Sequence, residues 1–146
     1  LKQCELEKMK VLEDSQRAAA DFLNTKKRLV EQQTLVIDRT TDDHIEKLLP
    51  ICDSFQMAMS NKELWECIDQ TWRAGMEGIY KQLQSLLDEY EVVRVNPLNE
   101  SFDPEKHEAL GTEESETEPE TIIKVIQDGY FRKGNLIRPA KVILSK

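Results

Sequence analysis

The N-terminal part of the chain carries apolar residues at a repeat of eleven positions. Leu1, Leu12 and Leu23 follow this spacing, and so do Val11 and Phe22. Because eleven residues complete three helical turns at about 3.67 residues per turn, these side chains stay on one face of a helix. Residues 1–60 also lack glycine and are rich in Lys, Glu, Gln, Leu and Ala, which favour helix. The pattern therefore predicts a long, nearly straight helix over most of residues 1–60.

An apolar stripe of this length has to be covered by another surface. The chain offers no second segment of equal length, so a second copy of the chain is the economical partner. Polar residues interrupt the stripe at Lys8, Lys26, Gln33 and Thr40. Polar positions at such a seam lower stability while they help to fix register. We therefore expect two copies to pair along this helix as a stalk of marginal stability.

One tetrapeptide in this segment, residues 40–43, has the sequence Thr-Thr-Asp-Asp. These residues disfavour helix interiors and favour helix caps, because their side chains compete for backbone hydrogen bonds. The sequence therefore predicts that the long helix breaks here and restarts.

The apolar pattern becomes denser between His44 and Glu91. Apolar residues recur at helical spacing on both sides of the turn-forming Ser60-Asn61-Lys62. This pattern predicts a helical hairpin, and the hairpins of two chains would form a four-helix bundle. The dimer interface predicted from both helical segments comprises Leu12, Ala19, Phe22, Leu23, Leu29, Leu48, Leu49, Phe55, Ile79 and Leu83.

Helical periodicity ends after Asn96-Pro97. Residues 121–126 and 140–144 are β-branched and aliphatic, and Gly129 and Gly134 supply turns between them. This pattern predicts a small antiparallel β domain. The expected fold class is therefore α+β, with a dimerisation region of one long helix and a hairpin over residues 1–95 and the β domain over residues 96–146.

Composition and charge narrow the function classes. The net charge is −8 and the isoelectric point is about 4.9, so the overall field repels nucleic acid and anionic membrane surfaces. The three cysteines, Cys4, Cys52 and Cys67, have no metal-binding spacing, and their odd number favours reduced thiols in a reducing compartment. We expect no nucleic-acid or membrane partner.

Candidate chemistry is sparse. His107 and Glu108 lie in the polar stretch NESFDPEKHEAL, residues 99–110, but no further ligand follows at a spacing that zinc sites use. The chain has no glycine-rich phosphate loop and no nucleophile motif. We therefore expect no catalytic residue, no metal and no cofactor, and a metal enzyme or hydrolase using His107 is the least favoured hypothesis.

Two basic features are candidates for partner binding. Lys26, Lys27 and Arg28 form a triplet in the long helix, where a solvated face is the ordinary interpretation. Arg138 lies in a β segment beside Leu136 and Pro139, where a surface strand residue is the ordinary interpretation. Arginine is nevertheless the preferred anchor for carboxylate-rich partner surfaces.

Five segments of the chain resemble, in order and spacing, the GrpE nucleotide-exchange factors of DnaK-type chaperones. The strongest are FDPEKHEAL and the GY…G..IRPA.V pattern that follows it. The segments are AADFLNTKKR (19–28), LLPICDSFQMAM (48–59), GMEGIYKQL (75–83), FDPEKHEAL (102–110) and GYFRKGNLIRPAKVILS (129–145).

The resemblance implies a homodimer with a paired helical stalk, a four-helix bundle and one β-wing domain per chain. It implies that a wing contacts the ATPase domain of the chaperone and opens the nucleotide cleft, so that ADP leaves. The stretch resembling FDPEKHEAL would mark the passage from bundle to wing, with Phe102 and Leu110 as packing residues and Asp103, Pro104 and His107 shaping the backbone.

The resemblance also implies roles for single residues. Arg138 matches the arginine of the family's IRPA stretch and is the first candidate for chaperone contact, with Leu136 and Pro139 as apolar neighbours. The triplet Lys26, Lys27 and Arg28 matches a basic triplet that lies near the chaperone. Gly75 matches a glycine of the bundle helix that permits close packing at the dimer interface.

The chain departs from the family at two positions. Glu91, at the end of the last bundle helix, and Glu120, before a strand, stand where the family usually has glycine. Glycine suits the left-handed conformation that ends a helix, so a glutamate implies a different exit or local strain.

The resemblance makes a co-chaperone of the bacterial cytoplasm the leading hypothesis, with a mitochondrial or plastid matrix as the alternative location. The alternative function is a coiled-coil adaptor that tethers partners without exchange activity.

Overall fold

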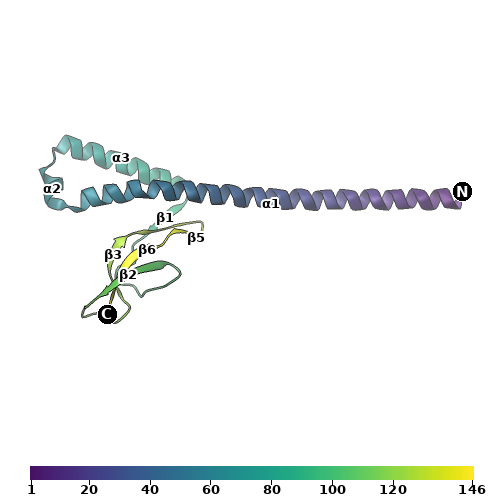
Figure 1. The fold of residues 1–146 in the computed structure, drawn as a ribbon. Coiled ribbons are helices and arrows are strands. Elements are labelled where there is room, and N and C mark those ends of the chain that lie inside the picture. Colours follow the sequence, from purple (N-terminus) through teal and green to yellow (C-terminus); the bar gives the residue numbers. More distant parts are fainter. The chain divides into compact units, whose positions relative to one another are not determined.

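The computed structural model describes all residues 1–146 and contains three helices and six strands (Figure 1). The helices are α1 (Lys2–Ser60), α2 (Lys62–Cys67) and α3 (Gln70–Glu89). The strands are β1 (Val92–Val95), β2 (His107–Glu113), β3 (Ile122–Gln127), β4 (Gly129–Arg132), β5 (Asn135–Arg138) and β6 (Ala140–Ser145). The predicted α+β class, with a long helix and a hairpin before a β domain, is confirmed.

The chain divides into two compact units, Leu1–Thr41 and Asp42–Lys146. The first unit is helical from Lys2 onward, and the side chains of its apolar stripe are exposed. The second unit holds the rest of α1, the hairpin and all six strands. The functional division at residues 95 and 96 stays a prediction.

The long helix does not break at residues 40–43, so that prediction was wrong. The side chains expected to form caps are used in other ways. Thr41 donates its hydroxyl to the carbonyl of Ile37 within the helix, at 2.7 Å. Asp42 accepts a hydrogen bond at 2.9 Å from Arg132, far along the chain. With their polar groups satisfied without unwinding the backbone, these residues remain helical.

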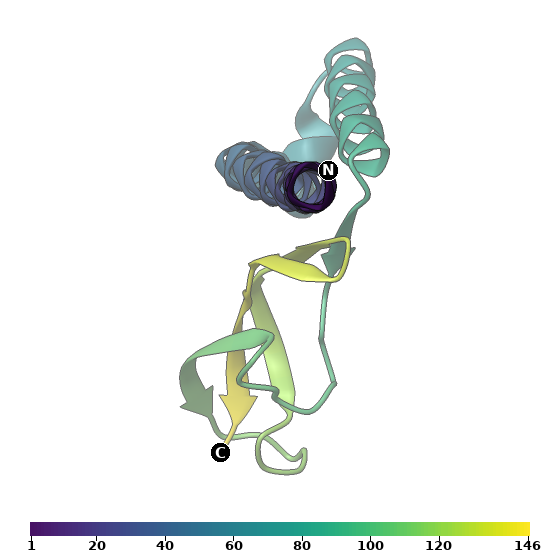
Figure 2. The same cartoon turned by 90° about the vertical axis from the view of Figure 1, so that its right-hand side faces the viewer.

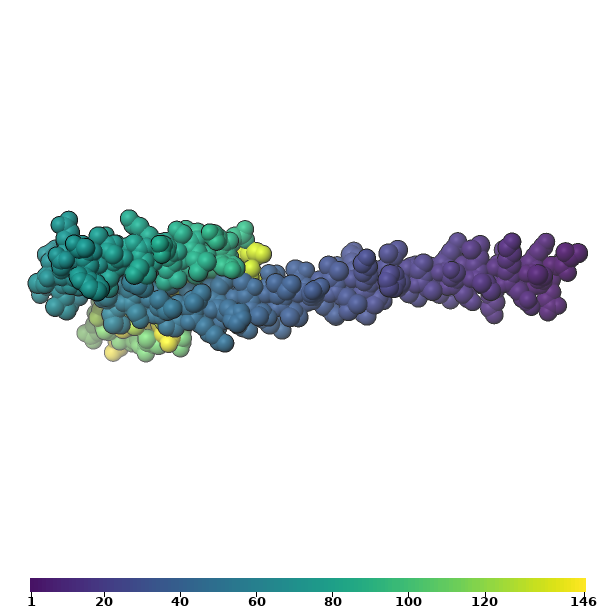
Figure 3. Space-filling view, turned by 90° about the horizontal axis from the view of Figure 1, so that it is seen from above, coloured from purple at the N-terminus to yellow at the C-terminus, as the bar shows by residue number.

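The predicted hairpin is confirmed. The first arm ends at Ser60, and Asn61 caps α2 by accepting the backbone N–H of Leu64 at 3.3 Å. In Figures 1 and 3, α3 returns alongside the C-terminal part of α1. The aromatic rings of Phe55 and Tyr80 join the two arms, with centroids 5.6 Å apart.

The six strands form two three-stranded sheets (Figure 2). Residues 92–145, which contain both sheets, are called the wing below. One sheet has the order β1-β4-β5 and the other β2-β6-β3. Every pair is antiparallel except β2 with β6, which is parallel, so the domain is mixed where a purely antiparallel one was predicted. The chain between these two strands is long enough for the crossover that parallel pairing needs.

Two apolar clusters hold the second unit together. Ile122, Ala140, Val142 and Leu144 form the first inside the wing, with Phe102 packed against them. The second cluster joins the wing to the helices, with Val92 and Tyr130 from the wing meeting residues of α1 and α3. Its buried members are Ile45, Leu49, Cys52, Leu87, Val92 and Tyr130.

The stretch FDPEKHEAL forms a turn and then the first residues of β2, which begins at His107. The carbonyl of Asp103 accepts the backbone N–H of His107 at 2.9 Å, and Nδ1 of His107 accepts the backbone N–H of Asp103 at 3.0 Å. Phe102 packs against the wing core as expected, whereas Leu110 is 51% exposed and is not a packing residue.

Both departures from the family pattern fall at left-handed backbone positions. Glu91 has φ of 59° and Glu120 has φ of 64°. At both positions the backbone therefore keeps the conformation that suits glycine, although the residue is a glutamate. Of the two predicted alternatives, the structure keeps the left-handed exit from α3, and the cost of a Cβ in that conformation stays a prediction.

Candidate functional site

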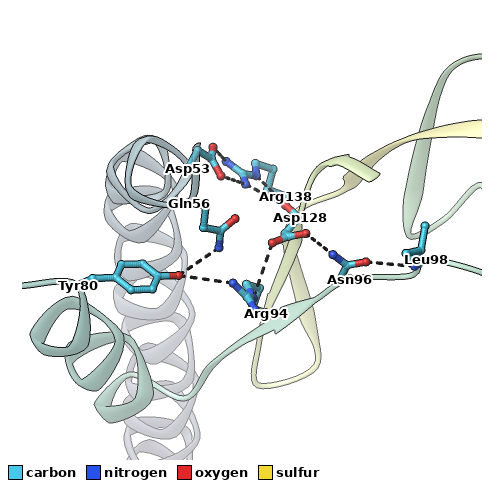
Figure 4. A network of polar contacts seen from close by, with 8 residues as sticks. All are labelled: Asp53, Gln56, Tyr80, Arg94, Asn96, Leu98, Asp128 and Arg138. Atoms are coloured by element: carbon cyan, nitrogen blue, oxygen red, sulfur yellow. Dashed lines mark hydrogen bonds and ion pairs between the residues drawn. The ribbon is translucent and has the colours of Figure 1, made fainter. Parts of the chain in front are cut away.

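The helices and the wing meet at a network of polar side chains built around Arg138 (Figure 4). Arg138, at the end of β5, bonds both carboxylate oxygens of Asp53 in α1, at 2.7 and 2.9 Å. Its Nε and Nη2 also donate to the backbone carbonyl of Asp128, at 3.2 and 2.9 Å. The guanidinium carbon lies 5.1 Å from the centre of the Tyr130 ring. All three nitrogens of the guanidinium therefore have hydrogen-bond acceptors within the chain.

Asp128 gathers a second group of contacts beside this pair. Its carboxylate accepts a hydrogen bond from Asn96 at 3.1 Å and lies 3.7 Å from the guanidinium of Arg94. Arg94 in turn donates to the hydroxyl of Tyr80 in α3, at 3.5 Å. Gln56 of α1 lies among these groups, and turning its amide lets it donate to Asp128 and accept from Arg94. The network thus connects both arms of the hairpin with strands β1, β4 and β5.

A second arginine of the wing also holds α1. Arg132, at the end of β4, is buried and donates to Asp42 at 2.9 Å and to the carbonyl of Tyr90 at 3.2 Å. Asp42 and Asp53 are eleven residues apart. At 3.6 residues per turn, this spacing puts both carboxylates within about 20° of one helix face and about 16 Å apart along the axis.

Burial and charge shift the pKa of three groups here. Burial alone would raise the pKa of Asp53, but the hydrogen bonds from Arg138 and Gln127 and the charge of Arg138 outweigh it and lower the pKa below 3.8. Burial, together with the charge of Asp53, raises the pKa of the Cys52 thiol. Burial also raises the pKa of Tyr130. At neutral pH the site therefore holds a carboxylate, a thiol and a neutral phenol.

The opposite face of the same sheet is apolar and open. Val93 pairs with Phe131, and Phe131 pairs with Leu136, so the three side chains form one row across β1, β4 and β5. Val93 is 58% exposed and Leu136 is 40% exposed. A cavity of about 600 Å³ adjoins this face, and its walls include Val93, Phe131 and Ala140. This face can take up apolar groups of a partner.

The predicted chaperone-binding residues therefore fall into three places. Leu136 belongs to the open apolar row, and Pro139, which is half-buried, follows Arg138 directly. Arg138 itself points the other way, toward the helices, and its side chain is only 11% exposed. Lys26, Lys27 and Arg28 are exposed on α1 in the first unit. The role of these six residues in chaperone binding stays a prediction.

The predicted dimer-interface residues are mostly uncovered in the single chain. Those of the N-terminal stripe and Ile79 are exposed, whereas Leu48, Phe55 and Leu83 are half-buried. A side chain added at Gly75 would meet no atom within 4 Å, so its surface is open to a partner. The exposed members are Leu12, Ala19, Phe22, Leu23, Leu29, Gly75 and Ile79.

Leu49 is the exception among the interface candidates. It has 0% exposure and lies in the cluster between the helices and the wing. Residues of its own helices and wing already cover it within one chain, so its assignment to the dimer interface stays a prediction that its burial does not support. The helical pattern marks Leu49 as apolar but does not say which surface buries it.

Sequence reasoning missed the acidic halves of the network. Asp53, Asp128 and Arg132 were not singled out, and Asp42 was considered only as a helix-capping residue. The available signal was that Asp42 and Asp53 border the apolar positions Ile45, Leu49 and Cys52 on α1, at the eleven-residue spacing. An acid beside a buried stripe calls for a basic partner.

The remaining candidates of the sequence lie apart from this network. His107 packs in the wing turn, with its ring 6.0 Å from that of Phe102. Nowhere in the structure do three or more His, Cys, Asp or Glu side chains gather in a way that could hold a metal ion. None of the helices combines the length and apolar character needed to cross a membrane.

Comparison with known proteins gives a consistent match. The family model described as GrpE matches residues 1–146. Protein GrpE of Caldanaerobacter subterraneus subsp. tengcongensis is 36% identical over 143 residues, which cover 97% of this chain and 68% of that protein. Protein GrpE of Azoarcus sp. (strain BH72) is 32% identical over 146 residues, covering 100% and 76%. Protein GrpE of Methylobacillus flagellatus is 33% identical over 129 residues, covering 88% and 68%.

Proposed function

The chain belongs to the GrpE family, whose members are co-chaperones and nucleotide-exchange factors, and on that premise we propose that it accelerates ADP release from a DnaK-type chaperone. The observation that carries the proposal is the match of the family model to the whole chain, helices and wing together. We further propose that it works as a homodimer, that it contacts the chaperone's ATPase domain, and that it acts in the bacterial cytoplasm.

The open apolar surfaces support the homodimer. Phe22 and Leu23 are 67% and 63% exposed, and Trp72 of α3 is 72% exposed. Fully burying one such side chain is worth roughly 1.5–3 kcal/mol, so several of them provide a substantial driving force for pairing. A shallow apolar cavity of about 200 Å³ beside Gly75 and Trp72 offers room for side chains of a second copy.

The exchange step requires the protein to bind the open-cleft chaperone better than the closed one, because equal affinity for both states would shift nothing. A thousandfold acceleration corresponds to about 4 kcal/mol of differential binding. The apolar row of Val93, Phe131 and Leu136 is the surface that we assign to this contact. By reciprocity, nucleotide binding weakens the complex, so ATP dissociates it.

The basic triplet has a separate part in this proposal. Lys26, Lys27 and Arg28 are exposed charges on α1, and exposed charges favour association rate and orientation more than affinity. Their contribution to chaperone binding should therefore fall steeply as salt increases, while that of Leu136 should not.

The test is the rate at which labelled ADP leaves a DnaK-type chaperone with and without the protein. We expect strong acceleration by the wild type and a clear loss with Leu136→Ser. Leu110→Ser is the matched control, because Leu110 is an exposed leucine of the wing's other sheet. An unchanged ADP release rate with wild-type protein would reject exchange activity. ATP-sensitive capture of the chaperone without acceleration would instead favour a tethering adaptor.

A further inference from the structure

Apolar contact between the wing and the helices is limited in extent. The wing contributes two buried residues to the shared cluster, Val92 and Tyr130, with Ile137 packed against them. A cavity of about 260 Å³ remains beside the cluster, lined by residues of α1, α3 and the wing that include Cys52, Tyr80 and Arg94. Packing that leaves such a space does not fix orientation by shape alone.

Directional contacts lie on the same boundary. Arg138 holds Asp53 through two parallel hydrogen bonds, a geometry that fixes angle as well as distance. Arg132 donates a hydrogen bond to Asp42 at 2.9 Å and another to the carbonyl of Tyr90, where α3 ends. Two attachment points on one helix prevent rotation about either of them. Neither pair belongs to the apolar row assigned to chaperone contact.

We propose that Arg138 with Asp53 and Arg132 with Asp42 form a two-point clamp that holds the wing at a fixed orientation on α1, so that these four residues position the chaperone-binding face without touching the chaperone. This inference rests on the proposed exchange function and adds residues that act through the wing's placement. Asp53 and Asp42 are its distinguishing members, because both lie on α1 and neither is part of the wing.

Cys52 reports on the clamp independently of any chaperone. Its side chain is 2% exposed beneath the wing, next to Asp53, while Cys4 and Cys67 are exposed. In a Cys4→Ser, Cys67→Ser background, the rate of Cys52 alkylation by N-ethylmaleimide measures how often the wing lifts.

The most informative variant is Arg138→Gln. The charge of Arg138 lowers the pKa of Cys52, so removing it leaves less thiolate and by itself slows alkylation. Faster alkylation in this variant therefore reports opening and not thiol chemistry. We expect the alkylation rate of Cys52 to increase about tenfold or more, because the variant loses several hydrogen bonds to a charged group. Arg138→Lys should protect Cys52 better than Arg138→Gln but less well than the wild type. Lysine keeps the positive charge, but its ammonium group cannot reproduce the paired hydrogen bonds that the guanidinium makes.

Controls separate the clamp from general charge effects. Lys124→Gln removes an ion pair with Glu113 on the same wing, at 2.7 Å but with side chains 56% and 46% exposed, and should leave alkylation unchanged. Asp53→Asn should reproduce Arg138→Gln, and the double variant should open no further than either single one. Far-UV circular dichroism checks that each variant keeps its helices.

The second readout is ADP release measured over a range of co-chaperone concentrations. The clamp predicts that Asp53→Asn and Arg138→Gln both lower the maximal release rate, in parallel with their Cys52 alkylation rates. The proposal is overturned if both variants leave Cys52 protected, or if Cys52 opens and exchange is unchanged. If the wild-type protein does not accelerate ADP release from the chaperone, the proposed exchange function is rejected. The Cys52 alkylation rates of the variants still decide whether the clamp exists.

Discussion

Replacing Glu91 by glycine is expected to stabilise the protein. Glu91 follows the C-cap residue Tyr90 of α3 and has φ of 59°, in the left-handed region. Its backbone N–H donates to the carbonyl of Asp88 at 3.0 Å, so the tight exit from the helix is hydrogen-bonded, and its side chain is exposed. The substitution removes a Cβ that the backbone conformation disfavours and leaves the hydrogen bond in place.

The magnitude follows from two opposing terms. A residue with a Cβ loses roughly 1–2 kcal/mol in the left-handed region, which glycine avoids. Glycine adds roughly 0.4–1 kcal/mol of conformational entropy to the unfolded chain, which offsets part of this gain. The net stabilisation is about 0.5–1 kcal/mol, or about 1–4 °C in Tm for a chain of this size. Glu120, with φ of 64°, is expected to behave in the same way.

Urea unfolding at a fixed protein concentration measures the effect, because a dimer's stability depends on concentration. Glu89→Gly is the matched control, since Glu89 is the last helical residue of α3 and has no positive φ. Glycine there should destabilise the helix by up to about 1 kcal/mol. The reasoning is refuted if Glu91→Gly lowers stability as much as Glu89→Gly does, because the strain at Glu91 would then carry no free energy.

Two further predictions concern titration and the wing turn. Because the pKa of Asp53 is depressed below 3.8 in the folded state, its stabilisation is present above the unfolded pKa and is lost as pH falls through the folded value. The stability difference between wild type and Asp53→Asn should thus be constant from about pH 5 to 8 and shrink below about pH 4, as followed by urea unfolding. His107→Ala should cost about 1–3 kcal/mol, because it leaves the backbone N–H of Asp103 without its acceptor. His44→Ala is the control, because His44 is exposed. An unchanged free energy of unfolding in His107→Ala would refute the role of that bond.

The helices were predictable because their signals are local. The eleven-residue repeat and the lack of glycine predicted α1, and the Ser60-Asn61-Lys62 turn predicted the end of the first hairpin arm. The predicted break at residues 40–43 failed because the partner that satisfies Asp42 is Arg132, ninety positions later. Helix propensity depends on residues close together in sequence, whereas the contact between Asp42 and Arg132 forms only when the chain is folded.

The β part shows the same limit. The strand pattern located β3 and β6, but alternation does not reveal that β2 pairs with β6 in parallel. Nor does it decide which face of a strand meets the helices. Arg138 was therefore expected on the partner-facing side, whereas its pairing with Tyr130 places it on the inner row.

The clamp also depends on the periodicity of α1. Asp42 and Asp53 share a helix face only while the eleven residues between them stay helical, because three unbroken turns bring the second carboxylate beneath the first. Unwinding anywhere between them would displace one acid from its arginine and leave the other as a single pivot. Pro50, whose ring cannot donate a backbone hydrogen bond, lies inside that interval. Helix integrity between Asp42 and Asp53 and the orientation of the wing are therefore one linked equilibrium, in which whatever stabilises this stretch of helix also holds the wing in place.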